Sequence, residues 1–187
     1  MVNLWRSIRF TVVFAILLGI IYPLVVTGIG NLVFPFQAKG SMVTLNGRVV
    51  GSELIAQHTT NPGLFWPRPS FVNYAANGSG GSNYGPTSPK LVAEVRANMK
   101  AADLPPGTKP SAIPPSMVES SASGLDPDIT IRDAMLQIPR IARATGMSEA
   151  SLRALVTKDT QHRIFGLWGQ PMVNVMTLNL AILHASR

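Results

Sequence analysis

The distribution of apolar residues divides this chain into two unequal parts. Residues 10–34 contain no charged side chain. A bilayer core of about 30 Å requires roughly 20 apolar residues in helical conformation, so this run predicts one transmembrane helix. We expect Pro23 to kink it, because proline has no N–H to donate to the preceding turn. The remaining residues are mostly polar and rich in Gly, Pro, Ser and Asn, and their length suits one domain.

Charged residues around the apolar run indicate an orientation. Arg6 and Arg9 precede the run closely, whereas Lys39 and Arg48 follow at a greater distance. Since basic residues favour the cytoplasmic side of a membrane helix, we expect the domain to lie outside the cytoplasm. A cleaved signal peptide is the alternative. A typical signal peptide, however, has a shorter apolar stretch than this chain, followed by a cleavage site of small residues. The predicted organisation is a cytoplasmic N-terminus, a transmembrane helix and a periplasmic or extracellular domain: residues 1–9, 10–34 and 35–187.

Local patterns in the domain predict both strands and helices. Asn46-Gly47 between two short apolar runs is typical of a β-hairpin turn. Helices are expected to begin at three capping residues: Ser88, Asp126 and Ser148. Pro139 is expected to kink or end the second helix, and a strand around Val173 leads into a C-terminal helix. The predicted fold class is therefore α+β.

A long irregular stretch, residues 58–90, separates the hairpin from the first of these helices. Loops of this length in a compact domain are usually functional or disordered. Its aromatic and proline residues around Trp66 allow two interpretations. Trp66 fills the core while the prolines fix a turn, or Arg68 is held rigidly to face a partner.

Charge and cysteine content exclude several classes of function. The 187 residues carry a formal net charge of +7 and no cysteine, which excludes disulfides and thiol nucleophiles. There is no run of Lys or Arg, so we predict no nucleic-acid binding. The helical segments contain scattered arginines that we expect on a solvated face, beside an anionic membrane or an acidic partner: Arg132, Arg140, Arg143 and Arg153.

No catalytic or metal-binding constellation is visible in the sequence. The three histidines are widely spaced, and no Walker-type loop or G-x-S-x-G motif is present. One Gly-rich segment is a candidate for holding phosphate, although we favour a flexible or tightly turned loop as its explanation. Its residues are Ser79, Gly80, Gly81, Ser82 and Asn83. We therefore predict no catalytic residues and no metal, and we assign no bound cofactor.

Several motifs in order resemble one protein family. After the apolar run come segments beginning at Gly51, Phe65, Gly81 and Ala122, and the chain closes with Val-Asn-Val and Leu-Asn-Leu-Ala segments. In this order they resemble KdpC, the C chain of the bacterial potassium-transporting Kdp ATPase, over nearly the whole chain. The tail departs from the family pattern Gly-Glu-Pro-Arg-Val-Asn, because Gln170 and Met172 replace the charged pair.

The resemblance implies a single-pass inner-membrane subunit for high-affinity, ATP-driven potassium uptake. Its implied partners are a potassium-channel-like subunit, a P-type ATPase subunit and membrane lipid. In the family this chain stabilises the complex, and it has been described as a catalytic chaperone that raises the pump subunit's affinity for ATP. ATP is thus implied through the pump subunit, and an effect transmitted through the span needs no direct contact.

The residues expected to contact partners come from the span and from the irregular stretch. Glycines in the span let neighbouring helix backbones approach closely. The full set is Gly19, Gly28, Gly30, Trp66, Arg68, Asn83 and Tyr84. The competing hypotheses are a membrane-anchored extracytoplasmic hydrolase and a binding module.

Overall fold

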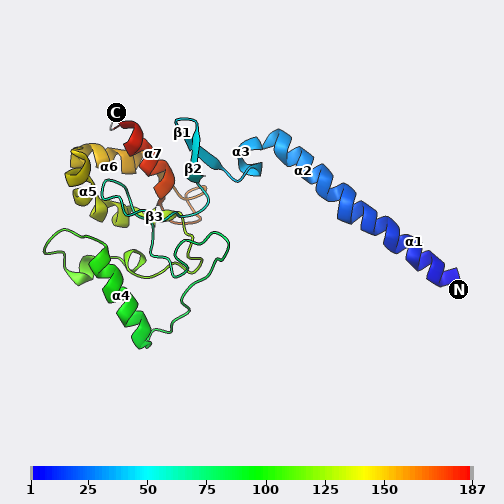
Figure 1. The fold of residues 1–187 in the computed structure, drawn as a ribbon, viewed down its shortest axis with the longest axis horizontal. Coiled ribbons are helices and arrows are strands. Elements are labelled where there is room, and N and C mark those ends of the chain that lie inside the picture. Colours follow the sequence, from blue (N-terminus) through cyan, green and yellow to red (C-terminus); the bar gives the residue numbers. More distant parts are fainter. Residues whose placement is uncertain (1, 186–187) are drawn as a thin grey trace. The chain divides into compact units, whose positions relative to one another are not determined.

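The computed structural model describes residues 2–185. It divides into two compact units, with the boundary between Met42 and Val43. The first unit is helical: α1 (Val2–Ile16), a π-helical turn η1 (Leu17–Ile21), α2 (Tyr22–Val33) and α3 (Pro35–Ala38). Asn3–Val33 is one helix of 31 residues, long and apolar enough to cross a membrane (Figure 1). This confirms the predicted N-terminal apolar helix.

The irregularity expected at Pro23 takes the form of the π-helical turn η1 directly before it. The N–H of Tyr22 bonds to the carbonyl of Leu17, five residues back. Pro23 has no N–H for the carbonyl four residues before it. A wider turn next to the proline is thus a local answer to a missing backbone donor.

The three glycines of this helix do not share one face. Gly28 and Gly30 both lie in α2, two positions apart, and residues at that spacing do not face the same neighbour. A side-chain carbon added at Gly19, Gly28 or Gly30 would meet no atom within 4 Å. Close helix approach at these positions can therefore occur on more than one side.

The second unit is an α+β domain, as predicted. Its regular elements are β1 (Met42–Leu45), β2 (Arg48–Ser52), α4 (Pro89–Ala101), the 3-10 turns η2 (Pro110–Ala112) and η3 (Pro115–Met117), β3 (Asp128–Thr130), α5 (Ile131–Thr145), α6 (Glu149–Lys158), β4 (Thr160–Gln161), β5 (Met172–Asn174) and α7 (Val175–Ala185). The hairpin turn of β1 and β2 is confirmed, with positive φ angles of 54° at Asn46 and 76° at Gly47.

The core lies between a small sheet and three helices. The sheet has the antiparallel order β3-β5-β4, with Ile129 opposite Val173. Helices α5, α6 and α7 gather beside it, and α4 lies at the other end of the domain (Figure 1). The buried cluster combines residues from these elements with one residue of the irregular stretch: Phe65, Ile129, Ala134, Ile138, Ile141, Leu152, Val156, Val173, Val175, Leu178 and Ile182.

The predicted cap of α5 at Asp126 is wrong by four residues. Asp128–Thr130 instead pairs as strand β3 with β5. The helix begins at Ile131 with Thr130 as its cap, and Thr130 and Asp133 bond each other's backbone N–H groups. Pro139 lies inside the helix and does not end it, and Gly146 closes the helix with φ of 75°. Pairing with the sheet thus outweighs the local Asp-Pro capping signal.

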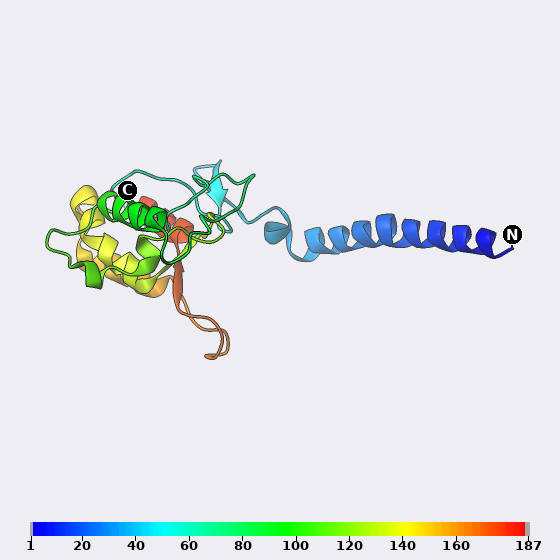
Figure 2. The same cartoon turned by 90° about the horizontal axis from the view of Figure 1, so that it is seen from below.

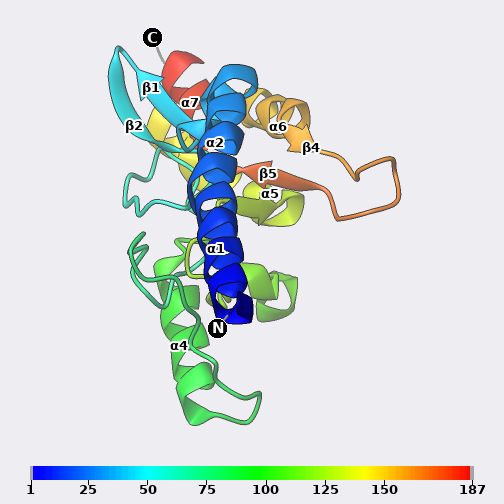
Figure 3. The same cartoon turned by 90° about the vertical axis from the view of Figure 1, so that its right-hand side faces the viewer.

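The starts predicted at Ser88 and Ser148 are confirmed. Pro89 is the first residue of α4, and the Ser148 hydroxyl accepts a bond from the N–H of Ser151 at the start of α6. One connection is unusual: residues 162–171 join β4 to β5 and extend away from the rest of the domain (Figures 2 and 3). We call these residues the tip loop.

Candidate functional site

Two side-chain amides hold the backbone of residues 61–74, which we call the aromatic–proline segment. Asn179 of α7 accepts a bond from the Phe65 N–H (2.7 Å) and donates to the Phe65 carbonyl (2.9 Å). Gln137 of α5 does the same for Trp66, at 2.7 and 3.0 Å. Buried backbone groups require partners, and these amides supply what a neighbouring strand would otherwise supply.

Arg140 lies beneath the same segment. Its guanidinium donates to the carbonyls of Pro62 (2.7 Å) and Leu64 (3.0 Å) and to the Gln137 side chain (2.8 Å). It also stacks on the Trp66 ring, 3.8 Å from the ring centre. Burial lowers the pKa of Arg140 to about 10, so the group stays charged at neutral pH. Arg140 is only 2% exposed, and the expectation that it lies on a solvated face is wrong.

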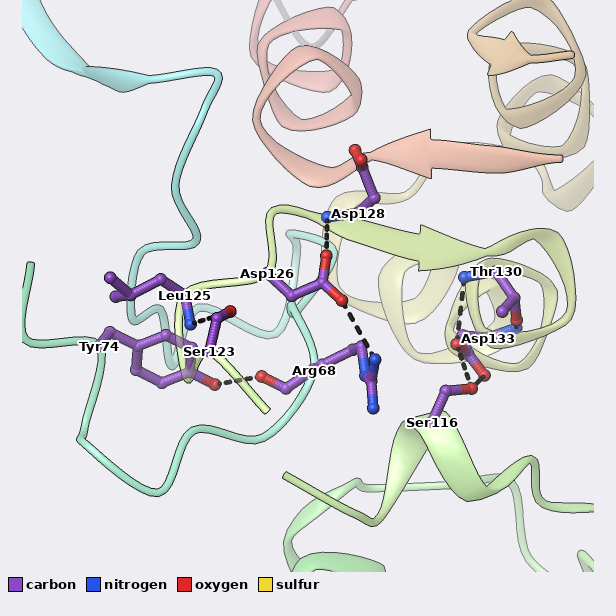
Figure 4. Close-up of polar contacts among 9 residues, drawn as sticks. All are labelled: Arg68, Tyr74, Ser116, Ser123, Leu125, Asp126, Asp128, Thr130 and Asp133. Carbon is purple, nitrogen blue, oxygen red and sulfur yellow. Dashed lines mark hydrogen bonds and ion pairs between the residues drawn. The ribbon is translucent and has the colours of Figure 1, made fainter. Parts of the chain in front are cut away.

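Arg68 is engaged within the domain. Its guanidinium pairs with Asp126 at 3.1 Å, and its carbonyl accepts a bond from the Tyr74 hydroxyl at 2.9 Å (Figure 4). Burial raises the pKa of Tyr74 to about 12. These contacts fit the structural interpretation of the segment, whereas contact of Arg68 with a partner stays a prediction.

Asn174 links three parts of the chain through its side-chain amide. Its side chain donates to the Glu53 carbonyl (2.9 Å) and to the Asp128 carboxylate (3.1 Å). Its oxygen accepts the N–H of Met176 and so caps α7. Burial raises the pKa of Asp128, the bond from Asn174 opposes that shift, and the nearby Asp126 adds to it.

The Gly-rich candidate for phosphate packs against residues 121–124. The Ser79 hydroxyl and the Gly80 N–H both donate to the Ser123 carbonyl, at 2.9 and 2.8 Å. A side-chain carbon at Gly81 would lie 2.9 Å from the Ala122 carbonyl oxygen. Two backbones thus approach closely here, which favours the tightly turned loop. Phosphate binding by this segment stays a prediction, with the Gly80 N–H already in use.

A cleft of about 610 Å³ opens between the aromatic–proline segment and α4. Lys90 and Glu94 of α4 contribute the charges of its lining, and Glu94 accepts a hydrogen bond from the Ser120 hydroxyl. Four aromatic side chains also line it: Trp66, Phe71, Tyr74 and Tyr84. Apolar walls with a few polar groups suit binding. The structure thus brings together two predicted partner residues, Trp66 and Tyr84.

The other predicted residues lie elsewhere. Asn83 has a positive φ of 52° and donates to the Gly81 carbonyl at 3.2 Å. The three glycines belong to the helical first unit. Within residues 2–185, no group of three His, Asp or Glu side chains could hold a metal ion.

Sequence reasoning did not predict that three residues would hold the aromatic–proline segment: Gln137, Arg140 and Asn179. A signal existed, because each is polar and lies next to apolar neighbours in a helix that packs on the core, as Asn179 does between Leu178 and Leu180. Such residues commonly satisfy buried backbone groups.

The fold and this site define a class: an α+β domain, with an aromatic cleft, carried behind one helix suited to spanning a membrane. Residues 4–184 match the sequence model of the family KdpC, described as "K+-transporting ATPase, c chain". The chain belongs to the KdpC family, which confirms the resemblance.

Two relatives illustrate the match. The protein named "Potassium-transporting ATPase KdpC subunit" of Caldanaerobacter subterraneus is 49% identical over 180 residues, covering 96% of this chain and 93% of its own length. The protein of the same name from Geobacter sulfurreducens is 48% identical over 186 residues, covering 97% of both chains. The similarity therefore extends over the helical unit and the domain alike.

The two departures from the expected family tail occupy different environments. Met172 is the first residue of β5 and pairs with Thr130 on one side and Gln161 on the other. Gln170 is exposed in the tip loop. Neither residue carries charge, so neither can form an ion pair that the resemblance implies at these positions.

Proposed function

We propose that this chain is a non-catalytic accessory subunit of an ATP-driven potassium uptake complex. Its partners in this proposal are a potassium-channel-like subunit and a P-type ATPase subunit. The observation that carries the proposal is the match over nearly the full length to proteins named as KdpC subunits of a potassium-transporting ATPase. Stabilisation of the assembly is the proposed role.

Purification with and without this chain tests the proposal. The partner subunits are expressed from the same genome, once with the tagged chain and once with its gene deleted. We expect the tagged chain to bring both partners with it, together with potassium-stimulated ATPase activity. A complex that assembles and hydrolyses ATP equally well after the deletion contradicts the proposed role.

We further propose an inner-membrane location with the N-terminus in the cytoplasm. The basis is the excess of positive charge before the span, at Arg6 and Arg9. Because the chain has no cysteine, single cysteines report topology directly. An impermeant thiol reagent should label Asn77→Cys in spheroplasts, while Asn3→Cys should react only after lysis. The reverse pattern contradicts this orientation.

The effect on ATP affinity, proposed from the family, fits transmission through the span. The span is the part of the chain able to reach both membrane faces, and coupling between separate sites requires only a shared equilibrium. Exchanging residues 10–33 for an unrelated apolar helix should raise the pump's KM for ATP. If residues 79–83 bind ATP directly, the opposite results are expected. A photoreactive ATP analogue should then label that segment, and the helix exchange should leave the KM for ATP unchanged.

The glycines of the span support contacts with partner helices on two sides. Gly28 and Gly30 point in different directions in α2, which suits a helix lying between two subunits. Gly28→Leu and Gly30→Leu should each weaken co-purification of a different partner, whereas Val26→Leu in the same helix should leave both in place. Unchanged recovery of both partners by the two glycine variants contradicts this arrangement.

A further inference from the structure

The tip loop exposes large apolar side chains that the domain does not cover. Phe165 is 88% exposed and Trp168 is 64% exposed. Ile164 and Leu167 are similarly open, and all residues from 162 to 170 are exposed. The loop extends away from the rest of the domain in two perpendicular views (Figures 2 and 3). A contiguous apolar surface of this kind marks an interaction site.

The loop has a defined shape before any partner binds. Ile164 and Trp168 exchange two backbone hydrogen bonds, at 2.9 and 3.1 Å. Phe165 and Gly166 close the turn with positive φ angles of 51° and 72°. The Phe165 and Trp168 rings lie edge to face, with 6.4 Å between their centres. The apolar side chains are therefore held together on one short hairpin, at the cost of a strained Phe165 backbone.

We propose that the tip loop inserts into the interfacial layer of the membrane that holds the chain's own span. Only residues 34–42 lie between α2 and the domain unit, and nine residues extend at most about 30 Å. The linker thus tethers the domain to a bilayer in every copy of this chain, which gives the domain a high effective concentration of lipid surface. This inference uses the span alone and is independent of the proposed transport function.

The chemistry of the loop matches a lipid interface. Tryptophan and other aromatic residues favour the headgroup level, where a ring contacts acyl chains and a polar atom contacts water. Arg163 and His162 adjoin the apolar residues, and the sequence contains no Asp or Glu after Asp159. Basic residues beside an inserting apolar segment add attraction to anionic lipids. We therefore expect an interface containing anionic headgroups.

A label on the full-length chain in nanodiscs tests this insertion. Phe165→Cys is coupled to an environment-sensitive fluorophore, and nitroxide-bearing lipids are placed in the same nanodiscs. We expect a blue-shifted emission, quenching by nitroxides near the headgroups and loss of quenching by aqueous iodide. The matched control is Asn77→Cys, which lies in another exposed loop and should keep a water-like emission. Far-UV circular dichroism confirms that both variants fold.

One further variant and a change of lipid test the lipid chemistry. Arg163→Gln should weaken lipid quenching of the label in anionic nanodiscs, and neutral lipid should weaken it without any substitution. A label that iodide quenches equally at positions 165 and 77, in both lipids, overturns the proposal. So does a label that is water-exposed in the chain alone and becomes protected only in the purified complex, because that result assigns the tip loop to a protein partner.

Discussion

The aromatic–proline segment and the tip loop are both irregular, yet the domain treats them in opposite ways. Phe65 is fully buried and its backbone bonds to Asn179, whereas Phe165 is 88% exposed and its loop bonds to itself. What differs is the set of side chains that reaches each backbone from the helices. An irregular segment becomes part of a core when polar side chains of regular elements pair its N–H and C=O groups.

Removing the guanidinium beneath the aromatic–proline segment should have the largest effect. Arg140→Met leaves the carbonyls of Pro62 and Leu64 without their donor and removes the stack on Trp66. We expect a loss of about 3 kcal/mol in the free energy of unfolding, measured by urea unfolding of the full chain in detergent. Arg143→Met is the control, because Arg143 is exposed and bonds to a carbonyl of its own helix. If the two variants are equally stable, side chains from the helices do not hold the aromatic–proline segment in place.

Gly81→Ala should have the next largest effect. The added carbon lies 2.9 Å from the Ala122 carbonyl oxygen, so one of two backbones has to move. We expect a loss of about 2 kcal/mol. Gly78→Ala has open space and should change stability by less than about 0.5 kcal/mol. If Gly81→Ala is as stable as Gly78→Ala, the Gly-rich loop is not held by residues 121–124.

Tyr74 makes the stability of the aromatic–proline segment depend on alkaline pH. Its folded pKa is raised to about 12 from 10.0, so the neutral phenol is favoured in the folded state. The contribution is complete below about pH 10 and is lost as the pH rises to about 12. Urea midpoints of the wild type should fall more steeply over that range than those of Tyr74→Phe. Parallel slopes for the two proteins contradict the assignment.

Substitution in the tip loop should have the smallest effect on stability. The double variant Phe165→Ser/Trp168→Ser removes two rings that contact each other and little else. Surface changes of this kind usually stay within about 0.5 kcal/mol, and relief of apolar exposure should improve solubility. A large loss of stability, measured by the same urea unfolding, indicates that the loop is part of the fold and breaks the comparison.

Local signals in the sequence were sufficient for the features that depend on neighbouring residues. The apolar helix, the Asn46-Gly47 turn and the starts of α4 and α6 follow from periodicity, turn residues and caps. Asp126 shows where such signals fail. It caps no helix, because residues 128–130 pair with a strand more than 40 positions later. Pairing partners at that separation leave no trace in the local pattern.

The candidate site was predictable only in part, for the same reason. The motif around Trp66 could be recognised, and both Trp66 and Tyr84 line the cleft. The side chains that hold it in place come from α5 and α7, 71 and 114 positions away. The burial of Arg140 likewise depends on these distant contacts. Arg140 and Arg143 lie in the same helix and carry the same charge, yet Arg143 is exposed.

The π-helical turn η1 changes how the span can be mapped by experiment. Because the N–H of Tyr22 reaches five residues back instead of four, the backbone spiral carries one extra residue at Leu17–Ile21. Each residue advances an α-helix by about 100°, so α2 is out of phase with α1 by about that angle. A cysteine-crosslinking scan plotted on one helical wheel would spread a single contact stripe over two faces. Two wheels, one before and one after the turn, recover the stripe.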